Sequence, residues 1–517
     1  MKSMEKDGRA LSIREAAGPG AGGDKAMLGA SSASTGLVEA QEEQFDEKET
    51  RRLLRKIDWH VIPIMSVVCL LCFLDRSNIG NARLHHLEQD LGLVGLQYNN
   101  CLAILFPFYI AAEIPSNMMM KRIRPSTWLA FIMLCWSVCT VGQGFVRSYG
   151  GLLATRALIG AFEGGLFPGI NFYITQWYRR SECAVRMAAF FGGATVAGAF
   201  GGLLARGIAE ADGAAGLAAW SWIFIIEGLL SLLVSFAAFR LISDYYPTAK
   251  FLTTAERREV ARRLTGDSFA GDPTTAAAAT ASDDFDSRYV WQALADWKIY
   301  VHMLICMAAF CPIYSFSMFL PTIVADMGYS AHDAQLVSVP PYVFACLFSV
   351  GGCWLADRAR ARGVFLLAFQ AVAALGLALL AAAPDPKTRY AGTVVAAIGI
   401  YPQIPLGLAW NSNNIGGSLK RATGIAMQAM GGNCGGIVAS YVYLAPDAPR
   451  YTAGHSILVG FVGIAFLSTL FMTTWYRREN ARRDAAAASS PGTKTTPERT
   501  ALDVGLADDA PSFRYTV

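Results

Sequence analysis

The chain has 517 residues, of which 53% are hydrophobic and only 16% are charged, and its mean hydropathy is +0.34. This balance is too apolar for an ordinary soluble protein and indicates a polytopic membrane protein. The net charge is only +4, so the composition indicates neither a nucleic acid nor another polyanion as a partner.

Apolar windows of about 18 to 25 residues recur along the chain, long enough to cross a bilayer as helices, without the alternating strand pattern of an outer-membrane barrel. We therefore predict an all-α membrane protein with about twelve transmembrane helices in two six-helix bundles. The predicted windows lie near 58–80, 98–119, 127–146, 150–174, 186–207, 219–242, 297–321, 334–356, 364–383, 391–411, 421–443 and 454–476.

Polar segments divide the chain further. Between the two sets of windows, the stretch GDPTTAAAATASDDFD at 271–286 has the composition of a flexible linker, and both chain ends are polar and are predicted to be disordered. The predicted organisation is a tail (1–50), an N-terminal bundle (51–242), a central loop (243–295), a C-terminal bundle (296–477) and a second tail (478–517).

Lysine and arginine concentrate in alternate loops. Examples are KRIR at 121–124, DRARAR at 357–362 and YRR at 476–478, and four more basic residues precede the first window. Because cytoplasmic loops carry the excess of basic residues, both termini and the central loop are predicted to face the cytoplasm. The long polar segment before the first window is unlike a cleavable signal peptide.

The cysteines indicate packing. Eleven are present, and the close pair Cys69 and Cys72 lies within the first window. A Cys-x-x-Cys pair can bind a metal, but no second pair or nearby histidine completes such a site. We predict neither a metal nor a cofactor.

Two six-helix halves joined by a long loop resemble the major facilitator superfamily. The loop CWLADRARAR at 353–362 is similar to the superfamily's loop signature, although Cys353 and Arg360 replace expected residues. In that signature the aspartate caps and pairs across a helix junction, which implies a structural or gating role for Asp357 and Arg358. The equivalent loop SNMMMKRIRPSTW at 116–128 lacks the aspartate.

The missing aspartate makes the chain similar to one branch of the superfamily, the anion:cation symporter family. Within that branch, the chain is similar to the fungal allantoate, nicotinate and pantothenate permease group. The resemblance implies a monomeric plasma-membrane protein that carries a small organic anion together with protons. The segments that carry it are FLDRSNIGNARL (73–84), EIPSN (113–117), RALIGAFEGGLFPGI (156–170), YPTAKFLTTAER (246–257), FLPTIVADMGYSAHDAQLVSVPPY (319–342) and WNSNNIGGSLKRATGIAMQAMGGNCGGI (410–437).

Few charges lie inside the windows. Asp75 and Arg76 come late in the first, and Arg156 and Glu163 lie two turns apart on one helix face in the fourth. A charge near the bilayer centre costs at least ~2.5–3.5 kcal/mol, so these groups must face a cavity or a partner. Arginine offers a carboxylate planar, paired hydrogen bonds, and a buried acid can carry a proton.

The resemblance implies that Asp75 and Glu163 are proton sites, that Arg76 anchors the substrate and that Arg156 is the partner of Asp75. The alternative is a structural ion-pair network that joins the first and fourth windows. Near the end of the second window, Glu113 precedes PSN and is predicted to have a structural role in an inner gate.

In the C-terminal half, Asn411 and Asn414 could hydrogen-bond a substrate, because a two-bundle carrier binds its ligand between both halves. Their position near the cytoplasmic mouth equally suits helix capping or gate closure. Tyr314 could line the same site, although aromatic residues at helical spacing also serve bundle packing.

The function implied is proton-coupled uptake of a small carboxylate such as nicotinate, pantothenate or allantoate by alternating access. The run AGAFGG at 197–202 replaces the G-P-x-x-G-G element of drug antiporters and favours uptake. Export of an acidic metabolite and a non-transporting nutrient sensor remain alternatives. An enzyme is not indicated, because no nucleophile has an adjacent base.

Overall fold

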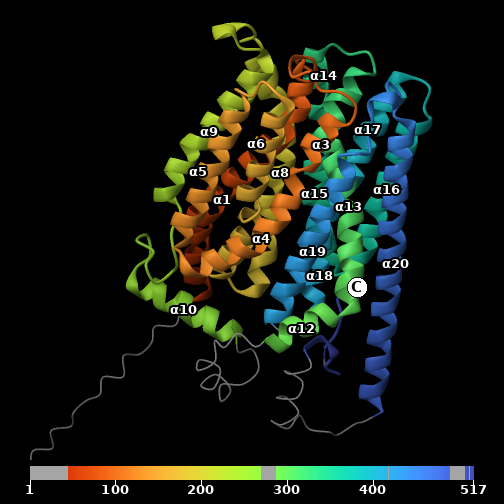
Figure 1. The fold of residues 1–517 in the computed structure, drawn as a ribbon. Coiled ribbons are helices and arrows are strands. Elements are labelled where there is room, and N and C mark those ends of the chain that lie inside the picture. Colours follow the sequence, from red (N-terminus) through yellow and green to blue (C-terminus); the bar gives the residue numbers. More distant parts are fainter. Residues whose placement is uncertain (1–44, 269–286, 417, 490–506, 512) are drawn as a thin grey trace, which may run out of the picture. The chain divides into compact units, whose positions relative to one another are not determined.

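The computed structural model describes residues 45–268, 287–416, 418–489, 507–511 and 513–517 (Figure 1). Helices dominate, and the described residues contain no strand, which confirms the all-α prediction. The predicted linker at 271–286 and most of the predicted N-terminal tail lie outside the described residues.

The first half of the chain begins with a 37-residue helix that starts at a capping box, in which Asp46 and Glu49 satisfy each other's backbone amides. Its helices are α1 (Glu47–Arg83), α2 (Leu87–Asp90), α3 (Gln97–Ala103), α4 (Leu105–Arg122), α5 (Pro125–Gln143), α6 (Tyr149–Glu163), α7 (Leu166–Thr175), α8 (Arg180–Ala209), α9 (Ala219–Leu241) and α10 (Thr254–Ser268).

The second half begins with a short amphipathic helix and ends with another 37-residue helix, drawn in blue in Figure 1. Its helices are α12 (Ser287–Ala295), α13 (Trp297–Ala325), α14 (Ala331–Val337), α15 (Val339–Ala359), α16 (Arg362–Ala382), α17 (Pro386–Ile400), α18 (Gln403–Asn414), α19 (Ser418–Ala439) and α20 (Thr452–Ala488).

Ten helices or helix pairs of the described chain are long and apolar enough to cross a membrane. The fifth and eleventh predicted windows coincide with α8 and α19, which are not among these ten. Several side chains in the first half of α8 lie outside the described residues, and its described stretch Val196–Ala209 is apolar. Helix α19 begins with charged residues and is rich in glycine, alanine and polar side chains. Twelve spans therefore stay a prediction.

Several predicted spans are interrupted helices. The fourth divides after Glu163, at Gly164 and Gly165, and the tenth divides at Tyr401 and Pro402. Proline has no amide hydrogen to donate and glycine adds backbone freedom, so these residues favour a break. The break after Glu163 matters most, because it ends α6 at a charged residue.

For orientation we define two ends of the bundle. The terminal side is where α1 begins, and there Lys56 of α1 contacts Glu256 of α10 at 2.8 Å. The distal side is where α1 ends, about 55 Å away along a 37-residue helix.

The two halves are in direct contact on the distal side. The amide of Asn99 in α3 donates to the carbonyl of Ser440 at 2.6 Å, and Tyr441 donates to Asn100 at 2.8 Å. At Gly80 of α1, a Cβ atom would overlap the carbonyl oxygen of Met318 in α13. Glycine therefore permits backbone contact between the halves.

The end of the chain differs from the prediction of a disordered tail at 478–517. Helix α20 continues to Ala488, and residues 508–511 and 513–517 pack against the C-terminal half, with Asp508 and Tyr515 buried. The prediction was based on the polar composition of this segment. Composition does not indicate whether a polar segment forms hydrogen bonds and ion pairs with residues far away in the sequence.

Helix packing generates a first prediction. A Cβ atom at Gly160 of α6 would overlap the carbonyl oxygen of Leu105 in α4, whereas Gly207 of α8 has open space around it. We expect Gly160→Ala to destabilise the protein by about 1–3 kcal/mol through overpacking. The matched variant Gly207→Ala should leave stability unchanged or slightly higher. Melting temperatures of the purified protein compare the two, and equal values would contradict this packing.

Candidate functional site

A buried ion pair lies between the two halves. Arg76 of α1 and Glu163 at the end of α6 are 4% and 0% exposed. The guanidinium donates from Nη2 and Nε to Glu163 Oε2, at 2.6 and 3.2 Å. Its third nitrogen, Nη1, donates to the hydroxyl of Tyr314 in α13 at 3.1 Å.

Tyr314 extends this network into the C-terminal half. Its hydroxyl donates to Asn433 Oδ1 of α19 at 3.3 Å. Aromatic rings enclose the guanidinium, with Arg76 Cζ 5.0 Å from the ring centroid of Tyr109 and 5.6 Å from that of Phe73. Cation–π attraction of this kind is stronger where water is excluded.

The local sequence explains why Glu163 reaches Arg76. At Gly164 a Cβ atom would overlap the carbonyl oxygen of Tyr109, so glycine is needed for α6 to approach α4 at this level. The close approach places the end of α6, and with it Glu163, beside the aromatic rings around Arg76.

Asp75 points into the N-terminal half. Its Oδ2 accepts hydrogen bonds from Trp136 Nε1 of α5 at 3.1 Å and from Ser231 Oγ of α9 at 3.0 Å. The side chains of successive residues on an α-helix point about 100° apart, so Asp75 and its neighbour Arg76 contact different helices.

The predicted partnership of Arg156 with Asp75 is not formed in this structure. Arg156 Nε instead donates to the carbonyl of Cys101 in α3 at 3.4 Å, and its Nη1 and Nη2 have no hydrogen-bond partner among the described residues. The sequence alone does not determine whether Glu163 pairs with Arg76 or Arg156, because the pairing depends on how the helices are rotated about their axes.

Two more buried carboxyls lie in the helices of the N-terminal half. Glu113 of α4 and Glu227 of α9 are buried, and neither has a hydrogen-bond partner within the described residues. Glu227 lies one turn before Ser231, the residue that donates to Asp75. A buried carboxylate without a hydrogen-bond partner is costly, so both positions carry a desolvation penalty that their surroundings do not offset.

The two asparagines predicted to contact a substrate have separate roles. Asn411 of α18 donates to Gln428 Oε1 of α19 at 2.8 Å, and Gln428 lines a small cavity together with Gln403 and Gly407. Asn414 instead donates to the backbone carbonyl of Thr516 at 3.0 Å, on the terminal side. Asn411 therefore contacts a residue that lines this cavity, and neither asparagine lines it directly.

The loop signature at the α15–α16 junction contains one clear pairing. Asp357 Oδ1 accepts from Nη2 and Nε of Arg362, at 2.6 and 3.0 Å, and Arg362 also donates to the carbonyl of Ala409 in α18. Arg358 lies over the ring of Trp354 instead. Arg362, not Arg358, is thus the partner of Asp357.

Sequence reasoning missed Asn433, Trp136 and Ser231 as polar neighbours of the buried charges. Asn433 could have been noticed as the polar residue within the glycine-rich run GGNCGG at 431–436. Trp136 and Ser231 carry no local signal. No group of three or more metal-binding side chains is found within the described chain, and the cysteines there form no disulfide bond.

Comparison with known protein families matches the Major Facilitator Superfamily over residues 65–440 and 302–505. The chain belongs to the Major Facilitator Superfamily. An uncharacterized transporter of Schizosaccharomyces pombe is 36% identical over 447 residues, covering 86% of this chain and 87% of that protein. The high-affinity nicotinic acid transporter of Saccharomyces cerevisiae is 32% identical over 468 residues, covering 90% and 84%.

Solved structures show the same fold. The xylose transporter XylE of E. coli, in a partially occluded inward open conformation, superposes with a TM-score of 0.60 at 14% identity, covering 80% of this chain and 98% of that one. A bacterial homolog of the human lysosomal transporter Spinster gives 0.59 at 17% identity, covering 80% and 96%. This facilitator is therefore an integral membrane transporter of small molecules, not an enzyme.

The buried ion pair generates a second prediction. Glu163→Ala leaves the Arg76 guanidinium buried without its carboxylate, so we expect a loss of about 3–5 kcal/mol in stability. The double variant Arg76→Met with Glu163→Leu removes both charges and should recover most of that loss. Melting temperatures of the single and double variants form the test, and a double variant as unstable as Glu163→Ala would contradict it.

Proposed function

We propose that this facilitator takes up a small organic carboxylate together with protons across the plasma membrane, with its terminal side in the cytoplasm. The observation that carries the proposal is the buried Arg76–Glu163 ion pair in contact with Tyr314 of the other half. A buried arginine held by a titratable carboxylate is a ready site for a competing carboxylate.

Competition for Arg76 supplies the coupling. If a cargo carboxylate replaces Glu163 on the guanidinium, two carboxylates and one buried cation remain, and the excess negative charge is costly away from water. Protonation of Glu163 removes that excess. Cargo and proton therefore enter together, and the proposed stoichiometry is one proton for each displaced carboxylate, with Asp75 available for a second.

The same network connects cargo binding to movement of the halves. Arg76 and Glu163 belong to the N-terminal half, and Tyr314 and Asn433 belong to the C-terminal half. A cargo that binds Arg76 and displaces Glu163 changes the contact between the halves at the level where alternating-access carriers bind substrate. For uptake, the distal-side contacts of Asn99 and Gly80 would have to separate first, so that cargo can reach Arg76 from outside, and they would re-form once cargo is bound.

The surroundings of Arg76 favour a flat, partly apolar acid. Phe73, Tyr109 and Tyr314 all present rings to the guanidinium within 5.8 Å. The relative in Saccharomyces cerevisiae that is named for nicotinic acid supports a pyridine carboxylate as the first cargo to examine. Pantothenate and allantoate follow, because a single arginine anchor suits them equally.

The third prediction is uptake of labelled nicotinate by yeast that lacks its own permeases and expresses this chain. Accumulation should increase in acidic medium and disappear when a protonophore collapses the proton gradient, since each pH unit supplies about 1.4 kcal/mol. Pantothenate and allantoate serve as parallel cargoes. A well-expressed protein at the cell surface that accumulates none of a broad carboxylate panel would contradict uptake, and efflux from preloaded cells would then favour export.

The fourth prediction separates anchoring from coupling. Arg76→Lys keeps the charge but loses the planar donor pair, so uptake should fall at least ~10-fold, equivalent to about 1.4 kcal/mol. Glu163→Gln cannot titrate, so accumulation against a gradient should be lost while exchange of labelled for unlabelled cargo persists. Reconstituted vesicles measure both activities.

Matched controls for these variants lie on the exposed surface. Arg240→Lys in α9 and Glu210→Gln at the end of α8 make the same chemical changes at exposed positions, and both should transport normally. If Glu163→Gln accumulates cargo as well as the unmodified protein does, Glu163 is not the coupling residue and the ion pair is structural.

A further inference from the structure

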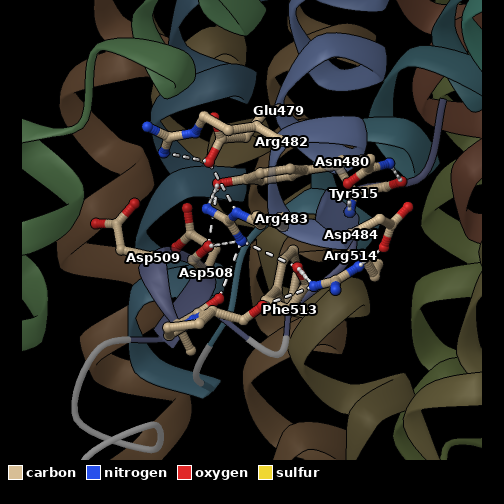
Figure 2. Close-up of polar contacts among 12 residues, drawn as sticks. Glu479, Asn480, Arg482, Arg483, Asp484, Asp508, Asp509, Phe513, Arg514 and Tyr515 are labelled. Atoms are coloured by element: carbon tan, nitrogen blue, oxygen red, sulfur yellow. Dashed lines mark hydrogen bonds and ion pairs between the residues drawn. The ribbon is translucent and has the colours of Figure 1, made fainter. Parts of the chain in front are cut away.

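Residues 508–511 and 513–517 occupy a site on the terminal side of the C-terminal half (Figure 2). The first residues of this segment are bound by ion pairs. Asp508 is 0% exposed and forms ion pairs with Lys298 of α13 and Lys420 of α19, both at 2.5 Å. Without Asp508, Lys420 would keep only Asp296, at 2.7 Å, and Lys298 would keep Asp296 at 3.5 Å and the exposed Asp509 at 3.2 Å.

The backbone of the segment is recognised by a single arginine. Arg483 Nη1 of α20 donates to the carbonyl oxygens of Asp508, Ala510 and Phe513, at 3.1, 3.0 and 3.0 Å. Its own position is held by Glu479, one turn earlier, at 2.8 Å. Figure 2 shows these carbonyls converging on the guanidinium.

An aromatic anchor follows. The ring of Tyr515 stacks on Tyr476 with centroids 4.6 Å apart, and its hydroxyl donates to the carbonyl of Asp508 at 3.0 Å. Asn480 holds the backbone of Tyr515 on both sides, donating to its carbonyl at 2.8 Å and accepting from its amide at 2.9 Å.

The end of the segment reaches α18. The carbonyl of Thr516 accepts from Trp410 Nε1 at 2.9 Å and from Asn414 Nδ2 at 3.0 Å, and its amide donates to Asn414 Oδ1 at 2.7 Å. Val517 packs against the apolar cluster that contains Trp410. Asn414, predicted to contact a substrate, is used here to bind the chain's own backbone.

We propose that residues 508–517 form a C-terminal latch, an intramolecular ligand whose docking holds the terminal-side ends of α13, α18, α19 and α20 together. The site recognises three features: a buried carboxylate, a tyrosine ring and an extended backbone next to the chain end. The identity of the transported cargo does not enter this inference.

The electrostatics keep the latch closed at neutral pH. Burial raises the pKa of the Asp508 carboxyl, but the nearby Lys298 and Lys420 ammonium groups outweigh burial, and the pKa lies below its usual value. Further titratable or charged groups around Asp508 are Asp296, Asp509, Tyr515, Arg483, Tyr476 and Glu479. A lowered pKa gives stability that is lost only as the pH falls through that pKa, so the latch stays docked at cytoplasmic pH.

A peptide supplied separately tests the proposal. The transporter truncated after Leu506 should bind a fluorescent peptide of sequence ADDAPSFRYTV, whereas the full chain, whose site is already occupied, should not. Two single substitutions at neighbouring carboxyls form a matched pair. The Asp508→Asn peptide should bind at least ~10-fold more weakly, while Asp509→Asn should change affinity less than ~3-fold, because Asp509 is 68% exposed.

Failure of the truncated protein to fold would not end the test. In the full chain, Asp508→Asn should increase hydrogen–deuterium exchange of the C-terminal peptide and lower the melting temperature, and Asp509→Asn should do neither. Equal exchange in both variants, equal affinity of both peptides, or peptide binding to the full chain as strong as to the truncated one would overturn the latch.

Discussion

The buried cation Arg76 is the constraint on which much of this structure depends. Placing a guanidinium at 4% exposure inside a membrane protein is costly unless every donor is satisfied, and three different partners do so. Glu163 supplies the opposite charge, the Tyr314 hydroxyl accepts a hydrogen bond from the remaining guanidinium nitrogen, and Tyr109 supplies an aromatic ring face. Those partners come from three helices, two in the N-terminal half and one in the C-terminal half, so the site is part of the interface between the halves.

The burial of Arg76 and Glu163 also requires that the backbones of neighbouring helices lie close together. Gly80, Gly160 and Gly164 each lie against a carbonyl oxygen of a neighbouring helix, where any side chain would overlap. Small residues allow helices in a membrane to pack by close contact where no hydrophobic effect drives them together. The glycines of the segment RALIGAFEGG thus explain how one of its two charges is accommodated, since they let α6 approach α4 closely enough to bury Glu163 beside Arg76.

Much of this could be predicted from the sequence, because apolar length and charge placement are local properties. The helical class and the superfamily were predicted correctly, and Arg76 and Glu163 were identified as candidate residues. Their pairing was expected only within the alternative of an ion-pair network joining the two windows, because the choice of partner depends on how α1 and α6 are rotated about their axes. The partners of Asn414 and Tyr515 were out of reach for a similar reason: a polar tail far along the chain has no local signal for docking. The proton and cargo roles of these residues remain proposals.

Helix α20 is longer than a helix needs to be to cross the bilayer. Its 37 residues extend about 55 Å, whereas the hydrocarbon core is about 30 Å thick. The excess extends beyond the hydrocarbon core and carries Glu479, Arg482 and Arg483, of which Arg483 binds the chain end and Glu479 holds Arg483 in place. The docked segment is consequently addressable by soluble proteins, antibodies or enzymes that never enter the membrane. An event in the aqueous phase can thereby be communicated to four membrane helices without any ligand passing through the transport path.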